Sequence, residues 1–421
     1  MPRWCSARFA SRCLVLAFCG VLANCGAPVG PAPVGVPQAP YAGPKAVPTT
    51  PVTAMPVPPP GGGPVKVAIL LPLSGPNAEL GKAMLEAAQL ALFTMGGERM
   101  ILLPRDTTGT ADGAASAAKA VIADGARLIL GPLIADEVEA VKPIAQAANI
   151  NVVAFSTKTQ IAGGNVFLMG FLPRQEIARE VSYAHEQGLS RFAALAPNTP
   201  YGHLMADSLK DVASEAGATV AQIEYFDPRV VDTSAAVKHL LGGGGVTAST
   251  ATNGPPPGGG PGFDALLLPE GGDQLKQIAQ QLKAAGVDRA QVRLLGSGLW
   301  DDPTISGDPA LAGGWFAASP PDLRLEFQQS YQATYGHPPQ QRLASLGYDA
   351  AALAAVLAKD NNPDPFSQQA IENPNGFTGV DGLFRFTPQG LVQRGLAVLE
   401  VEPGGAKLVS PAPKNFQDFA Y

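Results

Sequence analysis

The sequence predicts an α/β protein of two lobes, in which helices cover both faces of parallel β-sheets. From Val65 to about Pro403 the chain offers roughly 340 residues, enough for two lobes of about 150 residues each rather than one core. Within this span, short apolar runs alternate with helical patterns. No internal repeat of about 20 to 50 residues is visible, so a solenoid is not indicated.

Eight short apolar runs have the length and composition of buried strands. They span residues 67–71, 100–103, 128–130, 151–155, 192–196, 220–225, 265–268 and 292–295. Helical patterns lie between them, and the clearest span 78–93, 111–123 and 235–241. In the first of these, Leu80, Met84 and Ala88 recur every fourth residue on one face. Because strands and helices alternate, we expect parallel strands.

One stretch, from Gly242 to Gly262, interrupts this order with Gly, Pro, Ala and Thr. It offers almost nothing to bury, and we expect it to form a surface insertion.

The N-terminus has the features of a bacterial secretion signal. Three arginines precede an uncharged apolar run at 13–23, which is too short for a comfortable membrane span. Residues 22–25, Leu-Ala-Asn-Cys, resemble a lipobox, in which Asn24 departs from the usual Gly, Ala or Ser. We expect residues 1–24 to be removed as a signal peptide and Cys25 to be lipidated. An ordinary signal cut elsewhere, or an uncleaved anchor, is the alternative.

Cysteine usage and charge restrict the function classes. All four cysteines lie within the first 25 residues, so no disulfide, cysteine metal site or cysteine nucleophile is expected after cleavage. Cleavage also removes three arginines and no acid, which takes the formal net charge from −6 to −9. This acidity, without a basic run, argues against nucleic acid as a partner.

Residues 25–64 after the signal are dominated by Pro, Gly, Ala and Val. This composition favours extended conformers and cannot bury a core. We expect a tether that, when extended, spans on the order of 100 Å between the lipid and the folded part. A spacer without any length requirement is the alternative.

The loops after the first strands are the first candidates for a binding site, because ligands of parallel sheets lie at the carboxyl ends of the strands. Residues 73–77, 131–133 and 156–159 are such loops, and they are rich in small or hydroxyl residues. These residues can donate hydrogen bonds to a ligand carboxylate. They are also common in turns and helix caps, and for each loop taken alone a turn or cap is the favoured interpretation.

Five segments, in order, resemble the type I periplasmic binding-protein family, the branch that includes the leucine/isoleucine/valine receptors. They are VKVAILLPLSGPNAELGKAMLEAAQLAL, LILGPLIADEVEAVKPIAQAANINVVAFSTKT, LAPNTPYGHLMADSLKDVASEAG, LASLGYDAAALAAVLA and GFTGVDGLFRFTPQG. The resemblance covers nearly all of the 65–403 module. It implies two parallel sheets flanked by helices, three chain crossings between the lobes, a hinge and a central ligand cleft.

Matching the segments implies lobe one at about 65–171 and 321–378. Lobe two is then at about 172–319 and 379–402, followed by a tail at 404–421. Carried over residue by residue, Ser74 matches the family's first loop, Ser156 and Thr159 match its ligand-holding Ser/Thr loop, and Tyr201 matches its cleft tyrosine. These four are the expected ligand contacts.

The chain also departs from the family pattern. Ile134 and Ala135 stand where a serine is usual, and Lys158 stands where a small residue is usual. The acid expected soon after the strand at Phe167 is not evident in FLPRQEIARE, which weakens a free amino-acid ligand because a buried ammonium group needs an acceptor. Glu270 and Asp301 could replace the missing acid, although we expect both to be ordinary exposed carboxylates.

A narrower resemblance fits these departures. The lipid anchor, the proline-rich tether, ILLPRDTTGTADGAASAAKAVIADGARLILGPL and AFSTKT look most like the lipoproteins known as penicillin-binding protein activators. That branch implies a peptidoglycan synthase as partner, and Gly26 after the lipidated cysteine agrees with the outer membrane. The helical repeat domain of its best-known member is missing here. A receptor that delivers an amino acid or similar small solute to an ABC permease is the alternative.

Signals of an enzyme are weak. The four histidines, His185, His203, His239 and His337, are widely separated and form no zinc motif. The chain has no G-x-S-x-G elbow and no phosphate-binding G-x-x-x-x-G-K-[ST] loop. We therefore expect no catalytic residue, no metal and no cofactor.

Overall fold

The computed structural model describes residues 63–95, 99–242, 261–359, 362–417 and 419. The predicted signal peptide, Cys25 and nearly all of the predicted tether lie outside the described residues, as does the insertion between 243 and 260. None of the helices in the described ranges has the length and hydropathy that a membrane span requires.

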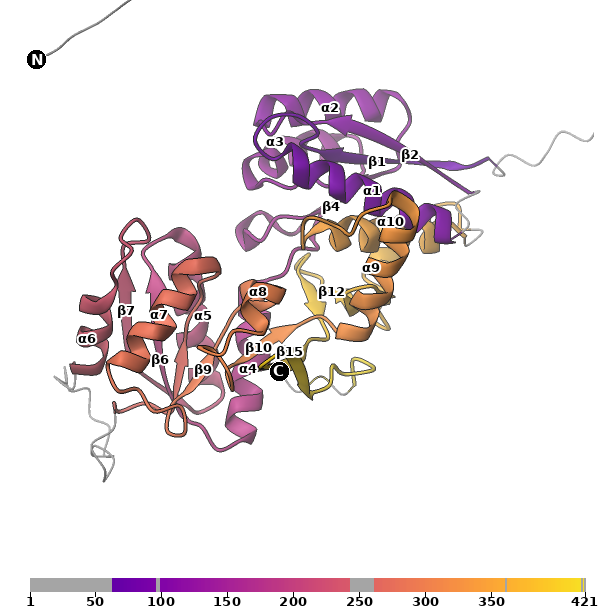
Figure 1. The fold of residues 1–421 in the computed structure, drawn as a ribbon. Coiled ribbons are helices and arrows are strands. Elements are labelled where there is room, and N and C mark those ends of the chain that lie inside the picture. Colours follow the sequence, from indigo (N-terminus) through magenta and orange to yellow (C-terminus); the bar gives the residue numbers. More distant parts are fainter. Residues whose placement is uncertain (1–62, 96–98, 243–260, 360–361, 418, 420–421) are drawn as a thin grey trace, which may run out of the picture. The chain divides into compact units, whose positions relative to one another are not determined.

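The first sheet has five parallel strands in the order β2-β1-β3-β4-β5. Its strands are β1 (Val65–Leu71), β2 (Met100–Asp106), β3 (Leu128–Leu130), β4 (Asn151–Ala154) and β5 (Val166–Leu168), and its helices include α1 (Ala78–Met95), α2 (Ala111–Ala123) and α3 (Ala135–Ala147). Successive side chains of a strand point to opposite faces. Val67 and Ile69 therefore pack with α1, while Ala68 and Leu70 pack with α2 and α3, so the sheet is buried on both faces (Figure 1).

The second sheet has seven strands in the order β15-β14-β10-β9-β8-β6-β7. They are β6 (Arg191–Pro197), β7 (Thr219–Phe226), β8 (Ala265–Leu267), β9 (Arg293–Leu295), β10 (Trp315–Ala318), β14 (Ala397–Glu402) and β15 (Gly405–Ser410). The first five run parallel, and β14 and β15 are antiparallel to their neighbours. Its helices are α4 (Pro173–Glu186), α5 (Pro200–Glu215), α6 (Ser234–Gly242), α7 (Gly272–Ala284) and α8 (Pro303–Ser306).

A third, antiparallel sheet of three strands follows the order β11-β12-β13. It consists of β11 (Phe377–Gly379), β12 (Gly382–Phe386) and β13 (Val392–Arg394), and the helices before it are α9 (Pro321–Tyr335), α10 (Ala344–Lys359) and α11 (Gln368–Ile371). Phe384, Phe386 and Val392 join the core around the first sheet, and α10 packs along α1.

The eight predicted strands and the three predicted helices all form. The parallel α/β fold expected from the sequence is therefore confirmed. The C-terminal antiparallel strands are the main difference: residues 405–410, expected in a tail, form β15 and pair with β14.

The chain passes between the two larger sheets three times. It leaves the first sheet after Leu168 in β5, returns after Ala318 in β10, and crosses again between Arg394 in β13 and Ala397 in β14.

Candidate functional site

Ser74 lies at the carboxyl edge of the first sheet, in a network centred on Asp106. Asp106 Oδ1 accepts hydrogen bonds from the backbone N–H groups of Leu73 (2.9 Å), Ser74 (3.3 Å) and Thr108 (2.7 Å). Burial alone would raise the pKa of Asp106, but these bonds and one from the Ser74 side chain outweigh it and lower the pKa. Asp106 thus fixes the loop that carries Ser74.

Ser156 and Thr159 follow β4. Ser156 is buried, and its Oγ accepts a hydrogen bond from the N–H of Lys158 at 3.2 Å. Thr159 is exposed and begins the 3-10 helix η1 (Thr159–Ile161). Lys158 forms a 2.6 Å ion pair with Glu139 on α3, a half-exposed pair of the kind that contributes little to stability.

Tyr201 comes from the second sheet, in the first turn of α5. Thr199 caps this helix with a 3.1 Å hydrogen bond from Gly202 N–H, and Pro200 starts it. Burial and the nearby charge of Glu176 raise the pKa of Tyr201 far above its usual range, although a hydrogen bond with the Ser297 side chain acts the other way. The phenol is therefore neutral and can donate its proton in a hydrogen bond.

Glu176 is a buried acid that was not among the site residues predicted from the sequence. It lies within FLPRQEIARE, in the first turns of α4, and is only 5% exposed. Its Oε2 accepts a hydrogen bond from Gly298 N–H at 3.0 Å. Burial raises the pKa of Glu176, while the positive charge of Arg342 and the Gly298 bond oppose that shift.

Gly298 is the point at which residues from distant parts of the chain meet. It begins the 3-10 helix η2 (Gly298–Trp300) after β9, and Ser297 caps η2. A Cβ at this position would lie 2.7 Å from Glu176 Oε1 and 3.3 Å from Arg342 Nη2. Arg342, from the turn before α10, also places its Cζ 4.8 Å from the ring centroid of Phe171. We call Glu176, Tyr201, Ser297, Gly298 and Arg342 the polar cluster.

Glu270 and Asp301 are both partly buried, so the expectation of ordinary exposed carboxylates is wrong. Asp301 forms an ion pair with Arg324 on α9, and its side chain is 18% exposed. Burial raises the pKa of Glu270, and its Oε1 accepts a hydrogen bond from Gly271 N–H at 3.0 Å. Asp301 is already matched by an arginine, which leaves Glu270 as the better acceptor for a ligand amine.

The structure thus places the four predicted contacts in different surroundings. Ser74 belongs to the Asp106 network, Ser156 and Thr159 to the loop after β4, and Tyr201 to the polar cluster. The Gly-Ser-Gly sequence after the predicted strand at 292–295 could have indicated Ser297 and Gly298. Arg342 has no local signal, because its role depends on a contact with residues far away in the sequence.

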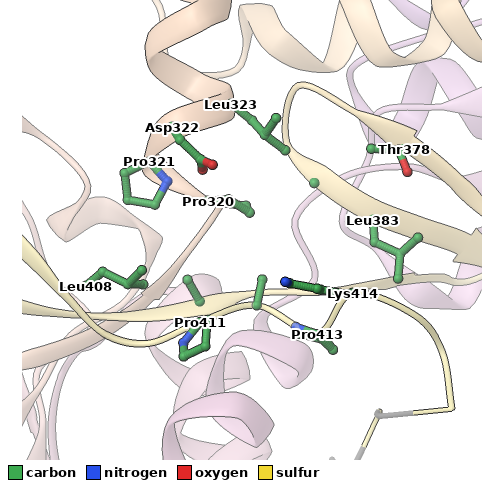
Figure 2. A pocket seen from close by; sticks show the side chains of 13 residues that line it. Pro320, Pro321, Asp322, Leu323, Thr378, Leu383, Leu408, Pro411, Pro413 and Lys414 are labelled. Carbon is green, nitrogen blue, oxygen red and sulfur yellow. The ribbon is translucent and has the colours of Figure 1, made fainter.

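Two cavities among the described residues lie elsewhere, each of about 320 Å³. Figure 2 shows the first, in which Pro320, Leu383 and Lys414 surround a mostly apolar space beside the connecting segments. The second lies against α10. Within the described ranges, no group of three or more His, Cys, Asp or Glu side chains is arranged to hold a metal ion.

Comparisons with known proteins agree with the fold described above. A family model described as "Periplasmic binding protein" matches residues 64–406. A branched-chain amino acid ABC transporter periplasmic ligand-binding protein of Burkholderia xenovorans superposes with a TM-score of 0.68 at 17% identity, covering 83% of this chain and 96% of that one. For LivJ of Streptococcus pneumoniae in complex with isoleucine, the TM-score is 0.57 at 19% identity, with 83% of this chain and 100% of the other covered.

An uncharacterised protein of Rickettsia prowazekii is 21% identical over 176 residues. That match covers 42% of this chain and 47% of the relative, so the two share about half of their lengths. At these identities the solved structures support the fold alone.

Proposed function

The chain belongs to the periplasmic binding protein family, and from that premise we propose that it is an envelope lipoprotein that binds a small solute without converting it. The polar cluster is the observation that supports this most. It combines a buried carboxylate, a neutral phenol, a hydroxyl and a guanidinium, donated by elements of both larger sheets. Such a set of few, convergent polar groups is typical of ligand sites rather than of packing.

The chemistry of these groups favours a ligand that carries a carboxylate. Arg342, Tyr201 and Ser297 offer hydrogen-bond donors, and Ser156 offers a further hydroxyl. Glu270 supplies an acceptor for an amine, since its raised pKa reflects burial without a cation as a cause. Ser74, Ser156, Thr159 and Tyr201 remain the proposed contacts, and closure of lobe one (65–171, 321–378) on lobe two (172–319, 379–402) would bring them together.

A titration experiment tests this proposal. The full-length protein is titrated in a calorimeter with amino acids, aromatic acids and muropeptides, and a binding protein should give saturable heat with at least micromolar affinity, about −8 kcal/mol. Tyr201→Ala and Arg342→Gln should abolish that heat. Arg229→Gln is the matched control, since the Arg229 side chain is 88% exposed and pairs with the neighbouring Asp227. Heat that survives both site variants would place the ligand elsewhere.

A second candidate, regulation of cell-wall synthesis, is favoured by the lipobox-like sequence at 22–25 and the proline-rich stretch at 25–64. A long tether suits a protein that reaches from the outer membrane towards a penicillin-binding protein. Ile134 and Lys158, which replace residues usual in the family's ligand loops, favour the same role. Co-purification with a penicillin-binding protein would support this candidate, whereas co-purification with an ABC permease and loss of solute uptake on deletion would support import.

A further inference from the structure

The segments that connect the two larger sheets are joined by buried polar side chains. Arg394, at the third crossing, donates from Nη2 to the carbonyl oxygen of Met169 at the first crossing, at 2.8 Å. Ser319, at the second crossing, donates from Oγ to Asp381 Oδ1 at 3.0 Å. All three crossings therefore contact one group of side chains.

Two carboxyl groups lie at the centre of this group. Asp349 on α10 and Asp381 between β11 and β12 are both fully buried. Asp349 Oδ1 accepts a hydrogen bond from Val380 N–H at 2.7 Å, and its Oδ2 lies 3.6 Å from Arg394 Nη1. Asp381 Oδ2 is buried and, within the described residues, has no hydrogen-bond partner.

The charges around the pair do not balance if both carboxyls are ionised. Two guanidinium groups face the pair of carboxyls, Arg394 from β13 and Arg324 from α9. Asp301, from the turn after η2, is a third carboxyl nearby because it forms an ion pair with Arg324. Three carboxylates would then face two guanidinium groups. Arg342, which also lies near Arg324, is matched by Glu176 in the polar cluster. Because a net buried charge is costly, we expect one of the carboxyl groups to bind a proton, which balances the charges.

We propose that Asp349 and Asp381 share a single proton and that this proton keeps the three connecting segments joined, so that the hinge loosens when the proton is lost. The unpaired Asp381 Oδ2 is a suitable place for it, since a carboxylic acid donates where a carboxylate can only accept. After deprotonation, two like charges would repel across the turn that carries Val380 and favour its opening, although the charged carboxylate is the better acceptor for the Val380 N–H.

The pH range follows from linkage. Burial raises the pKa of Asp349 from 3.8 to about 7, with a further contribution from Asp381 and an opposing one from Arg394. Local opening would return the carboxyl to its ordinary value of about 3.9. The closed state therefore holds an extra proton between about pH 4 and 7. The proton's contribution to the equilibrium constant that favours the closed state is complete below that range. It falls about tenfold per pH unit within the range and is lost above it.

Hydrogen exchange of the full-length protein, followed by mass spectrometry, tests the proposal. Protection factors for peptides covering 376–384 and 392–397 should fall as the pH rises from about 4.5 to 7 and then level off. The peptide of β1 (Val65–Leu71) should not change in this way. A wild-type profile without this slope would overturn the proposal.

Two variants separate a shared proton from an ordinary titration. Asp349→Asn and Asp381→Asn should each abolish the slope, because either change balances the remaining charges. Asp322→Asn, at an exposed position of α9, is the control and should keep it. A slope that persists in Asp381→Asn would assign the proton to Asp349 alone and refute sharing. If one variant fails to fold, the wild-type profile and the other variant still decide.

Discussion

Glu176 Oε2 accepts a hydrogen bond from the backbone N–H of Gly298 at 3.0 Å, which joins α4 to the turn after β9. The two residues depend on each other. Glu176 is buried and needs the donor, and Gly298 has to lack a side chain for the carboxylate and Arg342 to approach. This contact holds the polar cluster together.

Replacing Gly298 by Ala should destabilise the protein by about 1–3 kcal/mol, because the added methyl group would overlap Glu176 Oε1 and crowd Arg342. Urea unfolding measures the loss. Gly242→Ala is the matched control, since a Cβ there meets nothing within 4 Å. Equal stability of the two variants would show that the turn at Gly298 can shift to accommodate a methyl group and that the polar cluster is loosely packed.

Tyr201→Phe tests the hydrogen bond between Tyr201 and Ser297. Removing the phenol oxygen should lower the free energy of unfolding by about 1 kcal/mol, the net contribution of a hydrogen bond. Ser297→Ala should cost more, because Ser297 Oγ also accepts from Leu299 N–H. The double variant should lose less than the sum of the single ones, and strict additivity in this cycle would argue against a direct bond.

Much of the fold could be predicted because the first sheet and most of the second are parallel. Strands buried on both faces have sequences of short apolar runs, as in Val65–Leu71, and most of them are followed by an α-helix. The third sheet and β15 were not predicted because their strands are short or exposed. In β15, for example, Lys407 and Leu408 are exposed at the edge of the sheet.

The candidate site was less predictable. Position after a strand indicated the loops that carry Ser74, Ser156 and Thr159, since the carboxyl ends of parallel strands share an edge. Tyr201 was indicated only by the family resemblance. Helical periodicity places Glu176 on α4 but does not say which neighbours it meets. Its partners Gly298 and Arg342 come from a turn after β9 and a turn before α10, so only the folded chain reveals them.

Glu180 should make the stability depend on pH. Burial raises the pKa of Glu180 well above its usual range, and the charge of Glu176 adds to this, while the 2.9 Å bond from Ala317 N–H opposes it. Because the folded pKa is raised, the stabilising proton is held at low pH and is lost as the pH rises through that value.

Glu180→Gln, a neutral replacement of similar shape, should flatten this dependence and be at least as stable as the wild type at alkaline pH. Urea unfolding at several pH values measures it. Glu186→Gln, further along the same helix at an exposed position, is the control and should leave the profile unchanged. A Glu180→Gln variant that is less stable than the wild type at alkaline pH would mean that the carboxylate is ionised and needed there.

Arg394→Met should be the most damaging of these single changes. The Arg394 side chain is 1% exposed, faces Asp349 at 3.6 Å, and stands over Phe171 with its Cζ 4.9 Å from the ring centroid. Methionine would fill part of the space but leave a buried carboxyl without its cation, a loss of about 3–5 kcal/mol. Thermal and urea unfolding provide the measurement.

Arg385→Met is the matched control for this change. Arg385 lies on the neighbouring strand, is only partly buried, and stands over Phe416, so its removal should cost about 1 kcal/mol or less. Adding Asp349→Asn to Arg394→Met should recover part of the loss, because the uncompensated charge disappears with it. If the double variant is no more stable than Arg394→Met alone, the loss comes from packing and from the bond to Met169 rather than from the unmatched charge of Asp349.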